Sequence, residues 1–157
     1  MGDKALSTSL TTVLSCAIDE ARSLGSTTVE AEHLLLALAS DEKLTASTLL
    51  ADAGLNRAAI EAALHLERAE GLAAAGIGTV DESRLAATPR PARPGWGASV
   101  KVAIVRGKNA SDEDRRRRTA ETELLIGILH ASLGTVPRAL ALSGIDRRGL
   151  LERARQA

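Results

Sequence analysis

The chain has 157 residues, and its apolar fraction of 45% contains no Phe, no Tyr and a single Trp. Ala and Leu favour helices, whereas aromatic and β-branched residues favour strands, so this composition predicts an all-α protein. Lys and Arg together number 20, as do Asp and Glu, so the formal net charge is zero. The basic excess of a general nucleic-acid binder is therefore missing, and nucleic acid is not expected as a partner.

The same sequence argues for a cytoplasmic protein that makes no membrane contact. The N-terminus lacks the basic and then apolar pattern of a secretory signal. No apolar run approaches the roughly 20 residues that a helix needs to cross a bilayer. Cys16 is the only cysteine, which excludes an intramolecular disulfide and fits a reducing compartment. Next to Ala17 on a helix, we expect Cys16 to be a small buried thiol.

Apolar residues recur three and four positions apart in the first half of the chain, which is the spacing of a buried helical face. This pattern predicts helices over residues 8–24, 30–39, 45–53 and 57–70. Ser7 and Asn56 are predicted N-caps, and Gly25 and Gly54 are predicted helix stops. The run from Leu34 to Leu38 is apolar almost all round, so the second helix is expected to be central.

Residues 71–94 are rich in Ala, Gly and Pro without a sustained period and are predicted to be a connector. Helical periodicity resumes at about Ala98, and a charged loop follows over residues 112–118. Further helices are predicted over residues 120–132, 136–142 and 146–155. Pro137 fits this reading because proline is tolerated in the first turn of a helix.

The two halves of the chain repeat one another. Leu34 and Leu124 begin matching apolar runs, and Gly54 and Gly144 end matching helices, each pair 90 residues apart. The first helices match at an offset of 86. We therefore expect a first repeat at about residues 6–70, a linker at about 71–97 and a second repeat at about 98–157.

The first repeat resembles the Clp N-terminal repeat, which stands at the front of AAA+ unfoldases such as ClpC, ClpA and ClpB. The family pattern is Phe-Thr, Val-Leu, Ala, Glu-Ala, Leu-Gly and Thr-Glu-His-Leu-Leu. It is matched without a gap by Leu6-Ser7, Val13-Leu14, Ala17, Glu20-Ala21, Leu24-Gly25 and Ala31-Glu32-His33-Leu34-Leu35. The family's Phe-Thr-Pro-Arg opening is similar to residues 87–90, which would begin the second copy.

The resemblance implies an all-α fold in which two pseudo-symmetric four-helix repeats pack as one domain. It also implies a non-catalytic domain that binds proteins or peptides, with a Clp unfoldase or its substrates as partner. No Gly-x-x-x-x-Gly-Lys-Ser/Thr phosphate loop occurs in these residues. The chain is then either an excised N-domain or, as the favoured alternative, a stand-alone version without the ATPase. We expect it to act as an adaptor, a decoy or a sequestering protein in regulated proteolysis.

The resemblance also implies a ligand site. In ClpC-type domains, the hydroxyl residue of the opening motif and the Glu before the His help to hold phosphoarginine. Ser7, Glu32 and Thr88 occupy such positions here, whereas Thr122 replaces the second Glu. His33 is expected to pack at the start of its helix and to bond a neighbouring backbone group.

A second implied site is an apolar groove at Leu6 and Leu10, where relatives bind cyclic peptides through aromatic residues that this chain lacks. Cyclic-peptide or small-molecule sequestration is therefore an alternative function. The run Arg115, Arg116, Arg117 and Arg118 is predicted to be a solvated loop or a docking loop. A nucleic-acid-associated regulator that acts through this arginine run is a further alternative, but the run has no nearby aromatic residues on which bases could stack.

An enzyme is the remaining alternative, and its support in the sequence is weak. His33, His65 and His130 show no metal-binding spacing, and Cys16 has no partner histidine nearby. We expect no catalytic residue, no metal and no cofactor.

Overall fold

A computed structural model describes residues 2–78, 93–110 and 118–157, and for residues 2–7 it describes the backbone alone. Its helices confirm the all-α prediction. They are α1 (Gly2–Ser23), α2 (Ala31–Ser40), α3 (Thr45–Asp52), α4 (Arg57–Ala74), α6 (Ala98–Asn109), α7 (Ala120–Leu129), α8 (Thr135–Leu142) and α9 (Arg147–Gln156). The two short strands are β1 (Thr28–Val29) and β2 (Gly95–Trp96).

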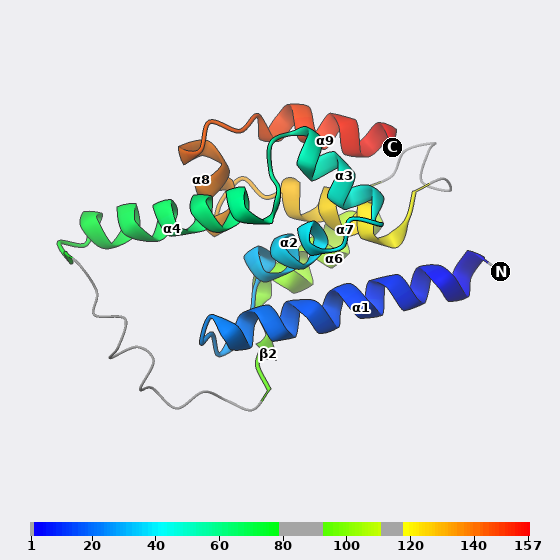
Figure 1. Cartoon of the computed structure of the whole chain (residues 1–157), viewed down its shortest axis with the longest axis horizontal. Helices are drawn as coiled ribbons and strands as arrows, with labels where there is room; N and C mark the ends of the chain where they lie inside the picture. The colour runs from blue at the N-terminus through cyan, green and yellow to red at the C-terminus, as the bar shows by residue number, and fades with distance from the viewer. Residues whose placement is uncertain (1, 79–92, 111–117) are drawn as a thin grey trace.

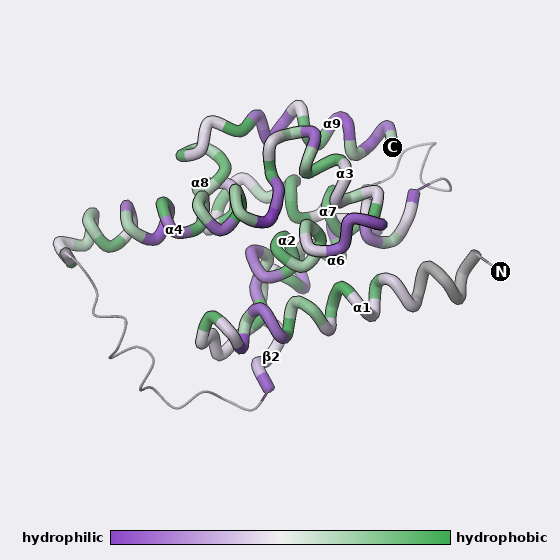
Figure 2. Tube along the Cα trace, in the orientation of Figure 1, coloured by the Kyte–Doolittle hydropathy of each residue, from purple (hydrophilic) through white to green (hydrophobic). Residues whose placement is uncertain are grey.

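The Leu-rich helices α2 and α7 form the centre of the domain. Every residue of α2 from His33 to Leu38 is buried, and so is every residue of α7 from Leu124 to Leu129. Figure 2 shows both segments as mainly apolar traces enclosed by the other helices. Burial of such long apolar side chains supplies the main driving force for folding. The prediction that each half buries its second helix is therefore confirmed.

Each central helix packs against the first helix of its own half, α2 against α1 and α7 against α6. The α6–α7 contact is especially close. A Cβ atom at Gly127 would overlap the backbone carbonyl of Ala103, and one at Gly107 would overlap the carbonyl of Glu123. The missing side chains let the two helix backbones approach each other.

The halves are also joined across the repeat boundary. The first half's α3 packs against α9, and α4 packs against α8, so the last two helices of each half contact the other half. In Figure 1, α4 and α8 lie side by side, and α2 lies between α1 and α4. Between α4 and α8, the buried carboxylate of Glu67 pairs with Arg138 at 2.5 Å.

The predicted helix ends are confirmed at several positions. Asn56 accepts a hydrogen bond from the amide of Ala59 at 2.8 Å, as an N-cap does. Gly25, Gly54 and Gly144 have φ values of 70°, 79° and 69°, a left-handed conformation that glycine adopts without strain. The equivalent glycines of the two halves therefore turn the chain in the same way.

Other details differ from the prediction. Because α1 begins at Gly2, Ser7 lies within the helix and is not its N-cap. Helix α4 continues to Ala74, beyond the predicted start of the connector at Gly71. Cys16 is exposed, since it precedes buried Ala17 by about 100° around the helix and so faces away from the core.

The strands were not predicted. Thr28 pairs with Gly95 and Val29 with Trp96 in a parallel register that ties the segment before α2 to the segment before α6. Among the described helices, none is long and apolar enough to cross a membrane.

Candidate functional site

The start of α2 is fixed by its own residues. The imidazole Nδ1 of His33 accepts a hydrogen bond from the amide of Glu30 at 2.8 Å, which confirms the predicted bond to a neighbouring backbone group. His33 is 4% exposed, and its burial lowers the pKa of the imidazole, with Glu30 and Glu20 opposing this effect. A neutral ring can accept this hydrogen bond, so burial and capping are consistent with each other.

The second repeat completes the same helix start. The amide of Ala31 donates to the hydroxyl of Ser99 at 2.8 Å, and this hydroxyl donates in turn to the carboxylate of Glu30. The Glu30 carboxylate also accepts from the amide of Ser99 at 3.3 Å. A Cβ atom at Gly97 would overlap this carboxylate, so a larger residue there would displace the Glu30 side chain from its present position. The position of Glu32, which follows directly, therefore depends on both repeats.

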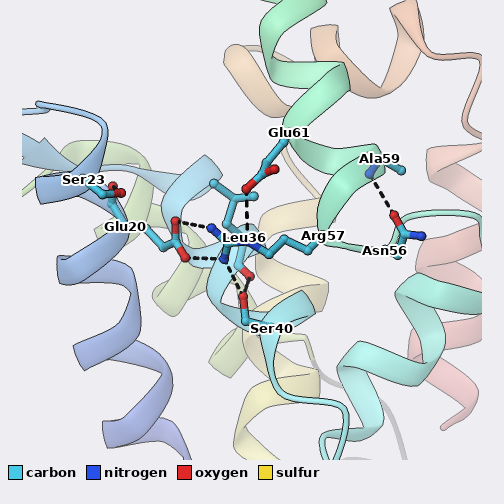
Figure 3. Close-up of polar contacts among 8 residues, drawn as sticks. All are labelled: Glu20, Ser23, Leu36, Ser40, Asn56, Arg57, Ala59 and Glu61. Carbon is cyan, nitrogen blue, oxygen red and sulfur yellow. Dashed lines mark hydrogen bonds and ion pairs between the residues drawn. The ribbon is translucent and has the colours of Figure 1, made fainter.

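Arg57, the first residue of α4, is the centre of a polar network beside α2 (Figure 3). Its guanidinium contacts both carboxylate oxygens of Glu20, donates to the Ser40 hydroxyl at 2.7 Å and pairs with Glu61 at 3.0 Å. Ser40 donates to the carbonyl of Leu36 at 2.7 Å. The hydrogen bond to Glu20 is the largest cause of the raised pKa of Arg57.

Glu32 differs from the other acids nearby. Desolvation by burial raises the pKa of its carboxyl group, a hydrogen bond from its own backbone amide opposes this rise, and the charges of Glu30 and Glu67 add to it. In the described part of the chain, it makes no hydrogen bond or ion pair with another residue. A desolvated carboxylate without a partner gains more from an incoming cation than a solvated one does.

Glu32 lies on the wall of a pocket of about 630 Å³ between α1, α2 and α4. Arg68 and His65 of α4 also line this pocket, and both are exposed. Leu24 adds an apolar surface that is 56% exposed. We call this space the first pocket. It combines the partly desolvated carboxylate of Glu32 with the hydrogen-bond donors Arg68 and His65 on the facing helix α4.

A second pocket of about 360 Å³ lies between the repeats, and Glu32 lines it too. Its other walls come from the start of α6, the end of α7 and the start of α8. Val102 and Leu133 are exposed apolar residues there, with Leu133 87% exposed. We call it the second pocket.

The residues expected to hold phosphoarginine do not all meet. Helix α1 rises about 1.5 Å per residue, so the backbone of Ser7 lies about 20 Å along α1 from Glu20, which shares the first pocket with Glu32. Ser9, near Ser7, instead contacts Glu121 at the start of α7. Thr88 lies outside the described residues. Of the three, only Glu32 is placed on a pocket.

The other predicted site residues are placed as follows. Leu10 is partly buried against the core, and the side chain of Leu6 lies outside the described part. Residues 115–117 are also outside it. Arg118 is 7% exposed, and its Nε donates to the carbonyl of Arg155 at 3.2 Å. At this residue the expectation of a solvated loop does not fit, because the side chain is held against α9.

The sequence reasoning missed Arg57, His65 and Arg68. The sequence did contain an indication of Arg57. This residue follows the predicted N-cap Asn56, and its partner Glu20 belongs to the matched family pattern. Arg68 lies two full turns beyond Glu61, so α4 presents both to the same side.

A model of the Clp repeat N-terminal domain family matches residues 5–90, which is more than half of the chain. This span contains most of α1, all of α2 to α4, and every residue of the first pocket except Thr135. A search of curated proteins finds no match. The chain therefore belongs to the Clp repeat N-terminal domain family, and it is a helical protein-interaction domain related to Clp systems.

Proposed function

We propose that this chain recognises arginine-phosphorylated proteins, or a Clp unfoldase that handles them, as an adaptor, decoy or sequestering protein of the cytoplasm. Membership of the family supports the Clp partner. The observation that carries the proposal is Glu32, a partly desolvated carboxylate on the wall of the first pocket that makes no hydrogen bond or ion pair with another described residue.

The first pocket suits phosphoarginine, which carries both a guanidinium group and a negatively charged phosphoryl group. Glu32 accepts the N–H groups of a guanidinium, and this neutralises a carboxylate that burial disfavours. Arg68 and His65, on the facing side, donate to the phosphoryl oxygens. Arg57 takes no part, since Glu20, Glu61 and Ser40 already occupy its guanidinium.

The test is degradation of an arginine-phosphorylated model protein by a purified Clp unfoldase and protease, with increasing amounts of this chain. A decoy or sequestering protein slows degradation by competing for a shared ligand, whereas an adaptor accelerates it. Glu32→Gln should abolish either effect. The matched control is Glu70→Gln, which changes an exposed residue of α4 outside the pocket. No effect of the wild-type chain on the rate contradicts the proposal.

The second pocket supports one alternative, sequestration of a cyclic peptide. It is apolar along Val102 and Leu133 and is built from both repeats. A thermal shift with a cyclic peptide that disappears in Leu133→Asp, while the phosphoarginine response remains, would favour this alternative.

A further inference from the structure

The two repeats carry opposite charges at one equivalent position of their first helices, and an arginine begins each fourth helix. Arg57 and Arg147 are 90 residues apart and begin the equivalent helices α4 and α9. In the first repeat, Glu20 of α1 neutralises Arg57. At the offset of 86 that relates the first helices, the residue equivalent to Glu20 is Arg106. The second repeat thus has the positively charged Arg106 at the position where the first repeat has Glu20, the acid that neutralises Arg57.

The same replacement extends to the neighbouring positions. Ser40, which accepts from Arg57, corresponds to His130, and His65 of the first pocket corresponds to Arg155. We call Arg106, His130, Arg147 and Arg155 the arginine cluster.

Hydrogen bonds bring the cluster together at the end of α7. Arg147 donates to the carbonyl of Leu129 at 2.5 Å, and the Nη2 of Arg155 lies 2.8 Å from the Nε2 of His130. Because Leu129 and His130 are consecutive, two guanidinium groups from α9 contact the same end of α7. Arg106 of α6 lines the second pocket together with Ala131, the residue after His130, and its positive charge acts on His130.

Among the described residues, the positive charges of the cluster outnumber the acids that contact it. Burial lowers the pKa of His130, and the positive charges of Arg155, Arg106 and Arg147 lower it further. Glu152 is the acid that faces this group, 3.5 Å from Arg155 and itself exposed. Asp146 already caps α9 by accepting from Gly149. Arg106 is exposed and forms no ion pair with any residue in the described ranges.

We propose that the arginine cluster is a binding site for an anionic segment of a partner protein, bearing a phosphate group or closely spaced carboxylates. Guanidinium groups bind such oxygens in a bidentate manner, and converging ones make a site for a doubly charged group. The exposed apolar residues Val102 and Leu133 of the adjoining second pocket fit a peptide, which brings apolar side chains with its charge. The zero net charge of the chain argues against a nucleic-acid backbone.

The experiment uses the full chain and fluorescent peptides of one length and frame, which carry a phosphoserine, three glutamates or only serines at the centre. We expect the phosphoserine or glutamate peptide to bind, with affinity that falls as salt rises, and the serine peptide not to bind. Comparison of the two anionic peptides tells a phosphate from a carboxylate ligand.

Arg106→Glu gives the second repeat the charge that Glu20 has in the first, and it should weaken binding about tenfold or more. Lys101→Glu makes the same charge change at another exposed position of α6 and should weaken it less than about twofold. Arg155→Gln tests the cluster from α9, and thermal unfolding confirms that each variant is folded. In NMR titrations, the bound anion should raise the pKa of His130 in the wild type but not in Arg106→Glu.

Equal binding of the serine peptide, equal losses in Arg106→Glu and Lys101→Glu, or tighter binding of a short DNA duplex would each overturn the proposal. Arg68→Gln, which changes the lining of the first pocket but not that of the second, should leave peptide binding at the cluster unchanged. The proposal is therefore tested separately from the function assigned to the first pocket.

Discussion

The guanidinium of Arg57 contacts both carboxylate oxygens of Glu20 and so joins the first residue of α4 to the last turn of α1. The Glu20 side chain is 15% exposed and that of Arg57 is 41% exposed, so water screens the pair only in part. Arg57 also reaches Ser40 at the end of α2. One side chain thus connects three helices that form the first pocket.

Arg57→Ala should therefore lower the free energy of unfolding by about 1–2 kcal/mol, since it leaves the half-buried Glu20 without its partner. Urea denaturation measures the change. The matched control is Arg22→Ala, because Arg22 pairs with Asp19 at 3.8 Å on the exposed surface of α1 and should contribute less than about 0.5 kcal/mol. Equal losses in the two variants would contradict the connecting role of Arg57.

Glu32→Gln should stabilise the folded chain at neutral pH. Burial raises the pKa of Glu32 above its ordinary value of 4.5, so the folded state holds this proton more tightly than the unfolded state does. The stability that comes from this group is complete below the unfolded pKa and is lost as pH rises through the folded pKa. Glutamine cannot ionise and avoids the loss.

The measurement is urea denaturation of both proteins from pH 4 to pH 8. The gain in Glu32→Gln should grow as pH rises from about 4.5 and then level off. Glu70→Gln, at an exposed position of α4, should show no such growth. A gain in stability together with a loss of ligand response is the pattern expected of a binding residue. A pH-independent difference would show that Glu32 is not desolvated in solution.

The helical fold could be predicted from the sequence because its signals are local. The apolar run from Leu34 to Leu38 and its equivalent at Leu124 require burial on all sides, and Gly54 and Gly144 mark the chain turns. These features depend on spacing and on backbone conformation within a few residues. The repeat then placed the same elements in the second half.

The candidate site could be predicted only in part because it depends on contacts between distant residues. The sequence indicated Glu32, but its position rests on the bond between Ala31 and Ser99, 68 residues away. Arg118 was misjudged for the same reason, since its contact with Arg155 joins residues 37 positions apart. Cys16 was misjudged although the helical period places it about 100° from buried Ala17. The reversal of charge from Glu20 to Arg106 was visible in the repeat, but its meaning required the position of Arg147.

Gly127→Ala should destabilise the chain by about 1–3 kcal/mol, because the new methyl group would overlap the carbonyl of Ala103 and force α6 and α7 apart. Gly71→Ala is the control and should have the opposite sign. It lies within α4 with open space around its Cβ position, so alanine should add about 0.5–1 kcal/mol through its helix propensity. Thermal or urea unfolding measures both. Destabilisation by Gly71→Ala, or tolerance of Gly127→Ala, would contradict the packing described.

Ser99→Ala tests whether the second repeat holds the start of α2. The hydroxyl of Ser99 accepts from the amide of Ala31 and donates to Glu30, so its removal leaves both groups without this partner. We expect a loss of about 1 kcal/mol, reduced in part by the higher helix propensity of alanine in α6. Ser15→Ala, on the exposed side of α1, should show the propensity gain alone. Because Glu32 follows Ala31 directly, faster amide exchange at Glu32 in Ser99→Ala, with unchanged exchange at Leu125 in the core of α7, would show that the repeats position this residue together.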